Sequence, residues 1–169
     1  MATKKSRLHI PRPTARPGDE PDFSYLELSD AGTVDKPSIN ARTRDIESLS
    51  SGLVRVLDEE SHAVGPWNPD LDPEKLQVAL RWMLLNRQFD KRMWQIQRQG
   101  RISFYMEAAG EEAVSIGAAM ALRAGDMCFP SYRNQGLYMY RGVKLVDMMC
   151  QCLSNTKDMC KGRQLPIMY

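Results

Sequence analysis

Apolar residues recur at helical spacing between residues 72 and 97, and this pattern predicts the longest element of the chain, a single helix. The apolar positions form two stripes rather than one. The first stripe contains Leu76, Leu80, Met83 and Leu84, and the second contains Leu85, Phe89, Met93 and Ile96. Asp72-Pro73-Glu74 marks the start of the helix with a capping side chain, a proline suited to the first turn and an acid near the positive end of the helix dipole. Two stripes predict that the helix is buried on two sides.

Shorter periodic segments follow this helix and alternate with short apolar runs. Three further helices are predicted at about 110–122, 134–140 and 144–153. Leu53–Leu57 is rich in aliphatic residues, Met127–Phe129 is an apolar run closed by Pro130, and both segments are predicted to be short strands. Strands that alternate with helices indicate an α/β fold.

The first 50 residues differ in composition from the rest of the chain. Five of the ten prolines lie within the first 37 residues, where they disfavour a continuous helix. We therefore expect residues 1–50 to form an extended or disordered arm and residues 51–169 to form a folded domain. The basic N-terminus lacks the apolar stretch of a secretory signal, and its prolines argue against the amphipathic helix of a mitochondrial transit peptide.

Charge and hydropathy argue against several classes of function. The 23 lysines and arginines nearly balance the 21 aspartates and glutamates, and the net charge of +2 argues against a nucleic-acid partner. No apolar run reaches the roughly 18 residues that a membrane span needs. The four cysteines lack zinc-knuckle spacing, so we interpret them as reduced thiols and expect no metal site in this chain. The motifs G-x-S-x-G, G-x-G-x-x-G, H-E-x-x-H and the Walker loop are absent, which leaves the catalytic residues unknown.

The segment Phe129–Gly136 is the strongest candidate for a ligand site. It is predicted to run from a strand through a turn into a helix, and ligands of α/β sheets bind beyond the carboxyl ends of strands. Arg133 can make a planar, bidentate contact to a phosphate, and Tyr132 can add a hydroxyl donor and an aromatic wall. The alternative is a surface arginine beside a half-buried tyrosine, and spacing alone leaves both interpretations open.

Other charged segments have simpler interpretations. Gln97–Tyr105 places two arginines around a glycine and before an aromatic pair, which indicates a cationic turn, and Lys161–Pro166 is a second basic loop. Glu111 and Glu112 lie near a predicted helix start, where acids interact favourably with the helix dipole.

Four segments taken together resemble a known family. Arg98–Tyr105, Gly110–Ala113, Phe129–Arg133 and Lys161–Tyr169, in this order and spacing, closely resemble the alpha subunits of branched-chain 2-oxo acid dehydrogenases, also called 2-oxoisovalerate dehydrogenases. The arm resembles the N-terminal extension of the bacterial subunits through Arg7–Pro11 and Asp22–Leu26. This resemblance implies a bacterial cytoplasmic protein, whereas a eukaryotic member would reside in the mitochondrial matrix.

The resemblance implies a thiamin-diphosphate-binding fold and an α2β2 assembly, with the cofactor and its magnesium ion held between alpha and beta subunits. The reaction implied is oxidative decarboxylation of branched-chain 2-oxo acids, with transfer of the acyl group to the lipoyl arm of an acyltransferase component. Tyr132 and Arg133 match the Tyr-Arg pair with which the family contacts the cofactor.

One departure from the family pattern bears on activity. The Gly-Asp-Gly…Asn motif that binds magnesium and diphosphate in the family does not occur among these 169 residues. We therefore expect the metal-binding motif to lie beyond this chain and the chain to be inactive alone. The alternative function is a non-catalytic interaction module that docks on a beta subunit.

Overall fold

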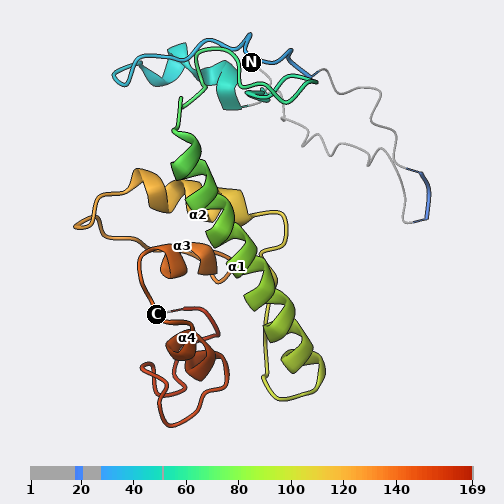
Figure 1. The fold of residues 1–169 in the computed structure, drawn as a ribbon, viewed down its shortest axis with the longest axis vertical. Helices are drawn as coiled ribbons and strands as arrows, with labels where there is room; N and C mark the ends of the chain where they lie inside the picture. Colours follow the sequence, from blue (N-terminus) through green and yellow to red (C-terminus); the bar gives the residue numbers. More distant parts are fainter. Residues whose placement is uncertain (1–17, 21–27, 51, 169) are drawn as a thin grey trace, which may run out of the picture. The chain divides into compact units, whose positions relative to one another are not determined.

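The computed structural model describes residues 18–20, 28–50 and 52–168, and the chain divides into two compact units, Met1–Asp70 and Leu71–Tyr169. The first unit contains two short 3-10 helices, η1 (Thr43–Asp45) and η2 (Glu47–Ser50). The second unit contains four α-helices, α1 (Pro73–Arg98), α2 (Glu112–Ala121), α3 (Gln135–Tyr140) and α4 (Leu145–Cys152) (Figure 1). The four predicted helices are thus confirmed, with ends within about two residues of those expected.

The predicted strand at 53–57 was wrong, because this segment makes only an isolated contact with residues 62–64 and forms no ladder. The backbone N–H of Asp58 donates to the carbonyl of His62 at 3.0 Å, and that of Val64 donates to Val56 at 2.8 Å. Only the single antiparallel bridge between Leu57 and Ala63 results. A strand needs a continuous ladder with a neighbouring strand, and the apolar composition of 53–57 carries no information about such a neighbour.

Helix α1 begins at Pro73 as predicted, but its cap differs from the expected one. Asp72 occupies the N-cap position and makes no capping hydrogen bond through its side chain. The carboxylate instead forms an ion pair with Lys75 at 3.2 Å, while the Asp72 carbonyl accepts a hydrogen bond from the N–H of Leu76. The backbone therefore supplies the first bond of the helix.

The two apolar stripes of α1 have different environments. Phe89 and Met93 of the second stripe are buried, and Leu85 and Ile96 pack against the core beside them. Leu76, Leu80 and Leu84 of the first stripe are each about half exposed. The expectation of burial on both sides is therefore met only for the second stripe within the described residues.

The core of the second unit joins the second stripe of α1 to residues from the C-terminal half of the chain. Its buried members are Phe89, Met93, Ile102, Tyr105, Met139, Met148, Cys152 and Ile167. The rings of Phe89 and Tyr105 meet edge to face, with their centroids 6.4 Å apart. The loops after α1 and α4 are therefore held to the same core as α3 and α4.

Helices α1, α2 and α3 pack against one another. In Figure 1, α2 crosses α1 and α3 lies beside α1. Gly136 of α3 lies at the closest point of this packing. A Cβ atom added to Gly136 would lie 3.2 Å from Asn86 Nδ2, Ile116 Cδ1 and Ser115 Cβ. The three helices can approach so closely because residue 136 has no side chain.

The predicted strand at 127–129 was also wrong, because the segment is an extended connection without a ladder. Met127 and Phe129 are 79% and 89% exposed. Arg141 holds the preceding turn by donating to the carbonyls of Arg123, Ala124 and Asp126 at 3.0–3.1 Å. Since the described residues contain no strand, the sheet of the predicted α/β fold is not confirmed.

The predicted division into an arm (1–50) and a domain (51–169) stays a prediction. Much of the arm, including the segments 7–11 and 22–26, lies outside the described residues. None of the helices formed by the described residues combines the length and the apolar character needed to cross a membrane.

The packing at Gly136 predicts a specific destabilisation. Gly136→Ala should lower the free energy of unfolding by about 1–3 kcal/mol, because the three neighbouring atoms must move to admit a methyl group. Gly117→Ala in α2 is the matched control, since a Cβ atom at that position would meet no packed neighbour within 4 Å and alanine favours a helix. Urea unfolding should show a loss for the first variant and no loss for the second. Equal stabilities would contradict the close approach.

Candidate functional site

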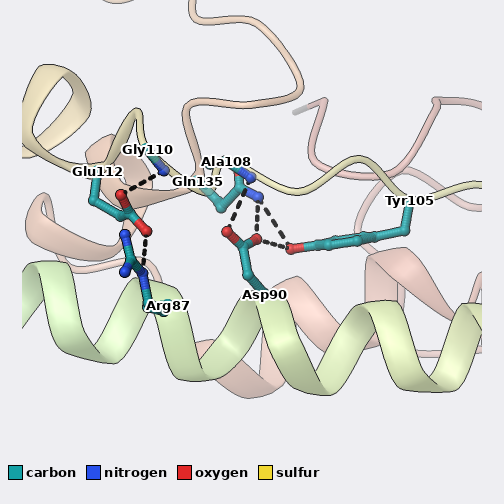
Figure 2. A network of polar contacts seen from close by, with 7 residues as sticks. All are labelled: Arg87, Asp90, Tyr105, Ala108, Gly110, Glu112 and Gln135. Carbon is teal, nitrogen blue, oxygen red and sulfur yellow. Dashed lines mark hydrogen bonds and ion pairs between the residues drawn. The ribbon is translucent and has the colours of Figure 1, made fainter. Parts of the chain in front are cut away.

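The carboxylate of Asp90 joins three segments of the second unit. Asp90 is 2% exposed and accepts hydrogen bonds from the hydroxyl of Tyr105 (2.6 Å), the N–H of Ala108 (2.9 Å) and the Nε2 of Gln135 (2.6 Å). Gln135 Nε2 also donates to the hydroxyl of Tyr105 at 3.0 Å. Figure 2 shows Asp90 pointing from α1 toward this group of donors. The network ties α1 to the loop before α2 and to the start of α3.

Burial of Asp90 has an electrostatic consequence. Removal from water raises the pKa of Asp90, although the three hydrogen bonds oppose this effect. Burial also raises the pKa of Tyr105, and the neighbouring Asp90 carboxylate raises it further. The tyrosine therefore stays protonated and acts as the hydrogen-bond donor of the pair.

A second carboxylate, that of Glu112, holds the turn that precedes α2. Glu112 is buried and accepts from Arg87 Nε at 2.6 Å and from the N–H of Gly110 at 2.9 Å. The hydrogen bond from Arg87 is the main cause that lowers the pKa of Glu112. Arg87 and Asp90 lie three positions apart on one face of α1, so the same face binds both ends of the loop 105–112 (Figure 2).

The segment that carries Tyr132 and Arg133 is held by its own polar contacts. Asn134 Oδ1 accepts hydrogen bonds from the N–H of Ser131 (2.8 Å) and from its hydroxyl (2.9 Å), and Asn134 Nδ2 donates to Ser115 of α2 at 3.3 Å. The ring of Tyr132 meets that of Phe104 edge to face at 5.8 Å. Contacts within this chain therefore fix the position of the turn.

Arg133 has an incompletely paired guanidinium group. Its Nη1 lies 3.3 Å from Glu111 Oε1, and both side chains are partly exposed, at 39% and 44%. Its Nε is buried and has no hydrogen-bond partner among the described residues. The guanidinium carbon lies 5.9 Å from the centre of the Tyr132 ring. An arginine whose guanidinium is only partly paired has the chemistry that suits an anion with several oxygens.

The predicted site residues have partners from two other segments: Tyr132 contacts Phe104, and Arg133 contacts Glu111. The sequence had indicated a cationic turn for Phe104 and a helix start for Glu111, and had connected neither residue to the site. The expected strand-to-helix geometry around Tyr132 and Arg133 is absent, and α3 has only six residues. The arginine side chain, rather than a helix end, is thus the feature suited to an anion.

The other basic segments have separate structural contacts. Arg98 stacks over the ring of Trp94 at 4.9 Å, and Gly100 ends the turn with a positive φ of 71°. In the loop 158–167, the carboxylate of Asp158 accepts hydrogen bonds from the backbone N–H groups of Cys160 (2.8 Å) and Gly162 (2.7 Å). Neither segment shares a described contact with Arg133.

Sequence reasoning missed Asp90, and it gave no role to Gln135, which lies within the candidate segment Phe129–Gly136. Asp90 lies next to the second apolar stripe, four residues after the buried Asn86. Polar residues at i and i+4 on the buried face of a helix are a signal of an internal polar network. Among the residues that the structure describes, no group of three or more histidines, cysteines, aspartates or glutamates is arranged to hold a metal ion.

The Asp90 network predicts that the hydroxyl of Tyr105 stabilises the fold. Tyr105→Phe should lower the free energy of unfolding by about 1–3 kcal/mol, because a buried carboxylate loses one donor. Tyr140→Phe is the matched control, since phenylalanine keeps the edge-to-face contact with Trp82. Thermal and urea unfolding measure the difference. An equal effect of the two substitutions would show that the hydroxyl of Tyr105 contributes nothing specific.

The Arg87–Glu112 pair predicts a pH dependence. The pKa of Glu112 is lower in the folded state than in the unfolded state, where it is about 4.3. The ionised Glu112 therefore stabilises the fold above about pH 4.3, and this stabilisation is lost as the pH falls through the folded-state pKa. Arg87→Met should therefore destabilise the chain more at pH 7 than at pH 3. Lys91→Met, one turn further along α1, should have the same small effect at both values. Asp90 has the opposite dependence because its pKa is raised in the folded state. Asp90 stays in both variants, and it interacts with Arg87 more weakly than Glu112 does.

Comparison with protein families and curated proteins identifies relatives of both parts of the chain. Residues 80–169 match the family model of the dehydrogenase E1 component. Residues 4–44 match the model of the N-terminal segment of the 2-oxoisovalerate dehydrogenase E1 alpha subunit, in agreement with the resemblance inferred for the arm.

Individual relatives are 2-oxoisovalerate dehydrogenase alpha subunits. The subunit from Pseudomonas aeruginosa is 56% identical over 163 residues, which are 96% of this chain and 40% of the relative. The mitochondrial subunit from Homo sapiens is 41% identical over 118 residues, 69% of this chain and 26% of the relative. The mitochondrial subunit from Dictyostelium discoideum is 39% identical over 115 residues, which are 68% of this chain and 26% of the relative.

The chain thus spans 40% or less of the length of these relatives, while the relatives match most of the chain. The predicted resemblance to 2-oxoisovalerate dehydrogenase alpha subunits is confirmed. Since the E1 model covers more than half of its residues, this chain belongs to the dehydrogenase E1 component family.

Proposed function

We propose that this chain provides the N-terminal part of the alpha subunit of a branched-chain 2-oxo acid dehydrogenase, the decarboxylating component of the complex. The observation that carries the proposal is the match of 96% of the chain, arm included, to a bacterial 2-oxoisovalerate dehydrogenase alpha subunit. The same match supports a bacterial, cytoplasmic protein, whereas the eukaryotic relatives are named as mitochondrial.

The cofactor of the proposed enzyme is thiamin diphosphate, and the residues of the candidate site suit its phosphate end. Arg133 offers a positive charge and a buried Nε without a partner among the described residues. Tyr132 provides an aromatic wall beside it. When bound, thiamin diphosphate supplies the carbanion that attacks the 2-oxo carbon and permits loss of carbon dioxide. The proposed role of Tyr132 and Arg133 is to bind and orient this cofactor.

The remaining polar residues have a supporting role in this proposal. Asp90 and Gln135 hold the start of α3, and Glu112 holds the turn before α2. These contacts hold the segment 131–135, which carries Arg133, and the segment 104–112, which carries its partner Glu111. We assign no catalytic residue to this chain, and we propose that magnesium is bound by residues outside it.

The proposed partners are a beta subunit in an α2β2 assembly and the lipoyl-bearing acyltransferase component. The exposed leucines of α1 and the exposed Met127 and Phe129 support association with further structure. We propose that strands outside these 169 residues supply the sheet of the family's α/β fold. The exposed leucines also favour a second candidate function, a non-catalytic module that docks on a beta subunit without binding cofactor.

Cofactor binding distinguishes the two functions. With a beta subunit and magnesium present, calorimetry should show binding of thiamin diphosphate that Arg133→Ala weakens at least about tenfold, because a charge-assisted contact is lost. Arg101→Ala removes an exposed arginine of the other basic segment and should leave the affinity unchanged. Co-purification with the beta subunit without any cofactor binding would favour the interaction module. Binding by the 169 residues alone would contradict the expectation that they are incompetent.

A further inference from the structure

Two adjacent glutamates before and within α2 have different contacts. Glu112 is buried and committed to Arg87 and Gly110. Glu111 is 44% exposed and has one described side-chain contact, the 3.3 Å pair with Arg133. Glu111 is the N-cap residue of α2, yet its side chain makes no capping hydrogen bond. Its carboxylate is thus turned to the arginine of the candidate site instead of to its own helix.

The pairing of Glu111 with Arg133 is incomplete. A carboxylate aligned with an arginine makes two parallel hydrogen bonds, whereas here one long contact reaches Nη1 and the buried Nε stays without a partner among the described residues. Glu111 therefore neutralises the charge of Arg133 without using its full hydrogen-bonding capacity. An anion with more oxygens can satisfy the guanidinium better.

The segment that carries Arg133 does not depend on Glu111 for its position. Asn134 closes the turn through Ser131 and contacts Ser115, and Tyr132 packs on Phe104. Loss of the Glu111 contact therefore leaves the turn in place. This separates the effect of Glu111 on the charge of Arg133 from any effect on the fold.

We propose that Glu111 is an internal competitor for the anionic ligand of Arg133. This inference rests on the proposed function, in which the ligand is the diphosphate of the cofactor. The Glu111 carboxylate contacts Nη1 and leaves it when a phosphate oxygen takes its place. Glu111 thus lowers the affinity of the site and eases release of the anion.

Glu111→Gln tests this role because it removes the charge and keeps the size of the side chain. In the complex of the chain with a beta subunit and magnesium, the variant should bind thiamin diphosphate about twofold to fivefold more tightly, in line with the loss of a partly exposed ion pair. Inorganic pyrophosphate is the second probe and should gain affinity by a similar factor. Glu107→Gln, which removes one charge from an exposed residue of the same loop, should change neither affinity.

A double-mutant cycle separates this inference from the proposed function. In the Arg133→Ala background, Glu111→Gln should have no further effect on affinity, because the competed group is gone. If Arg133→Ala weakens binding but Glu111→Gln leaves it unchanged or weaker, the competitor role is overturned and the cofactor site stands. If Arg133→Ala has no effect on binding, the site itself is misassigned. Thermal unfolding of each variant checks that the fold is intact.

Discussion

The buried carboxylate of Asp90 is the constraint on which the second unit depends. A carboxylate that is 2% exposed is costly unless hydrogen bonds replace water, and here the donors come from three places in the chain, Tyr105, Ala108 and Gln135. Helix α1, the loop before α2 and the start of α3 must therefore adopt one relative arrangement. Apolar packing against Phe89 and Met93 supplies the burial, but it is much less specific about register than the three hydrogen bonds are.

This arrangement extends to the candidate site through sequence neighbours. Gln135, which donates to Asp90, directly follows Asn134, the residue that closes the turn around Arg133. On the other side, Glu112 anchors the turn beside Glu111. Arg133 therefore precedes the fixed residue Asn134, and Glu111 precedes the fixed residue Glu112. The side chains of Arg133 and Glu111 themselves remain partly exposed. A scaffold of this kind positions a charged group without consuming its hydrogen-bonding capacity.

The sequence predicted the features that depend on local periodicity. Helix α1 and the burial of Phe89 and Met93 follow from a 3.6-residue repeat, which needs no knowledge of the rest of the chain. The strands at 53–57 and 127–129 failed because a strand is defined by its partner, and apolar composition does not specify one. Tyr132 and Arg133 were singled out from the residue types of the segment Phe129–Gly136, and the family resemblance added the cofactor as their ligand. Asp90 was missed because its donors lie 15, 18 and 45 residues away.

The choice of an arginine at position 133 follows from the same geometry. Its Nε is buried, while Nη1 reaches the partly exposed Glu111. A lysine would place a single ammonium group at the end of a flexible chain, with no second donor fixed within the turn. The planar guanidinium instead keeps two donors at different depths on one rigid group. An anionic ligand that contacts both Nη1 and Nε gains the buried donor that Glu111 leaves unused. The ligand and the Glu111 carboxylate therefore differ in hydrogen-bond geometry as well as in charge.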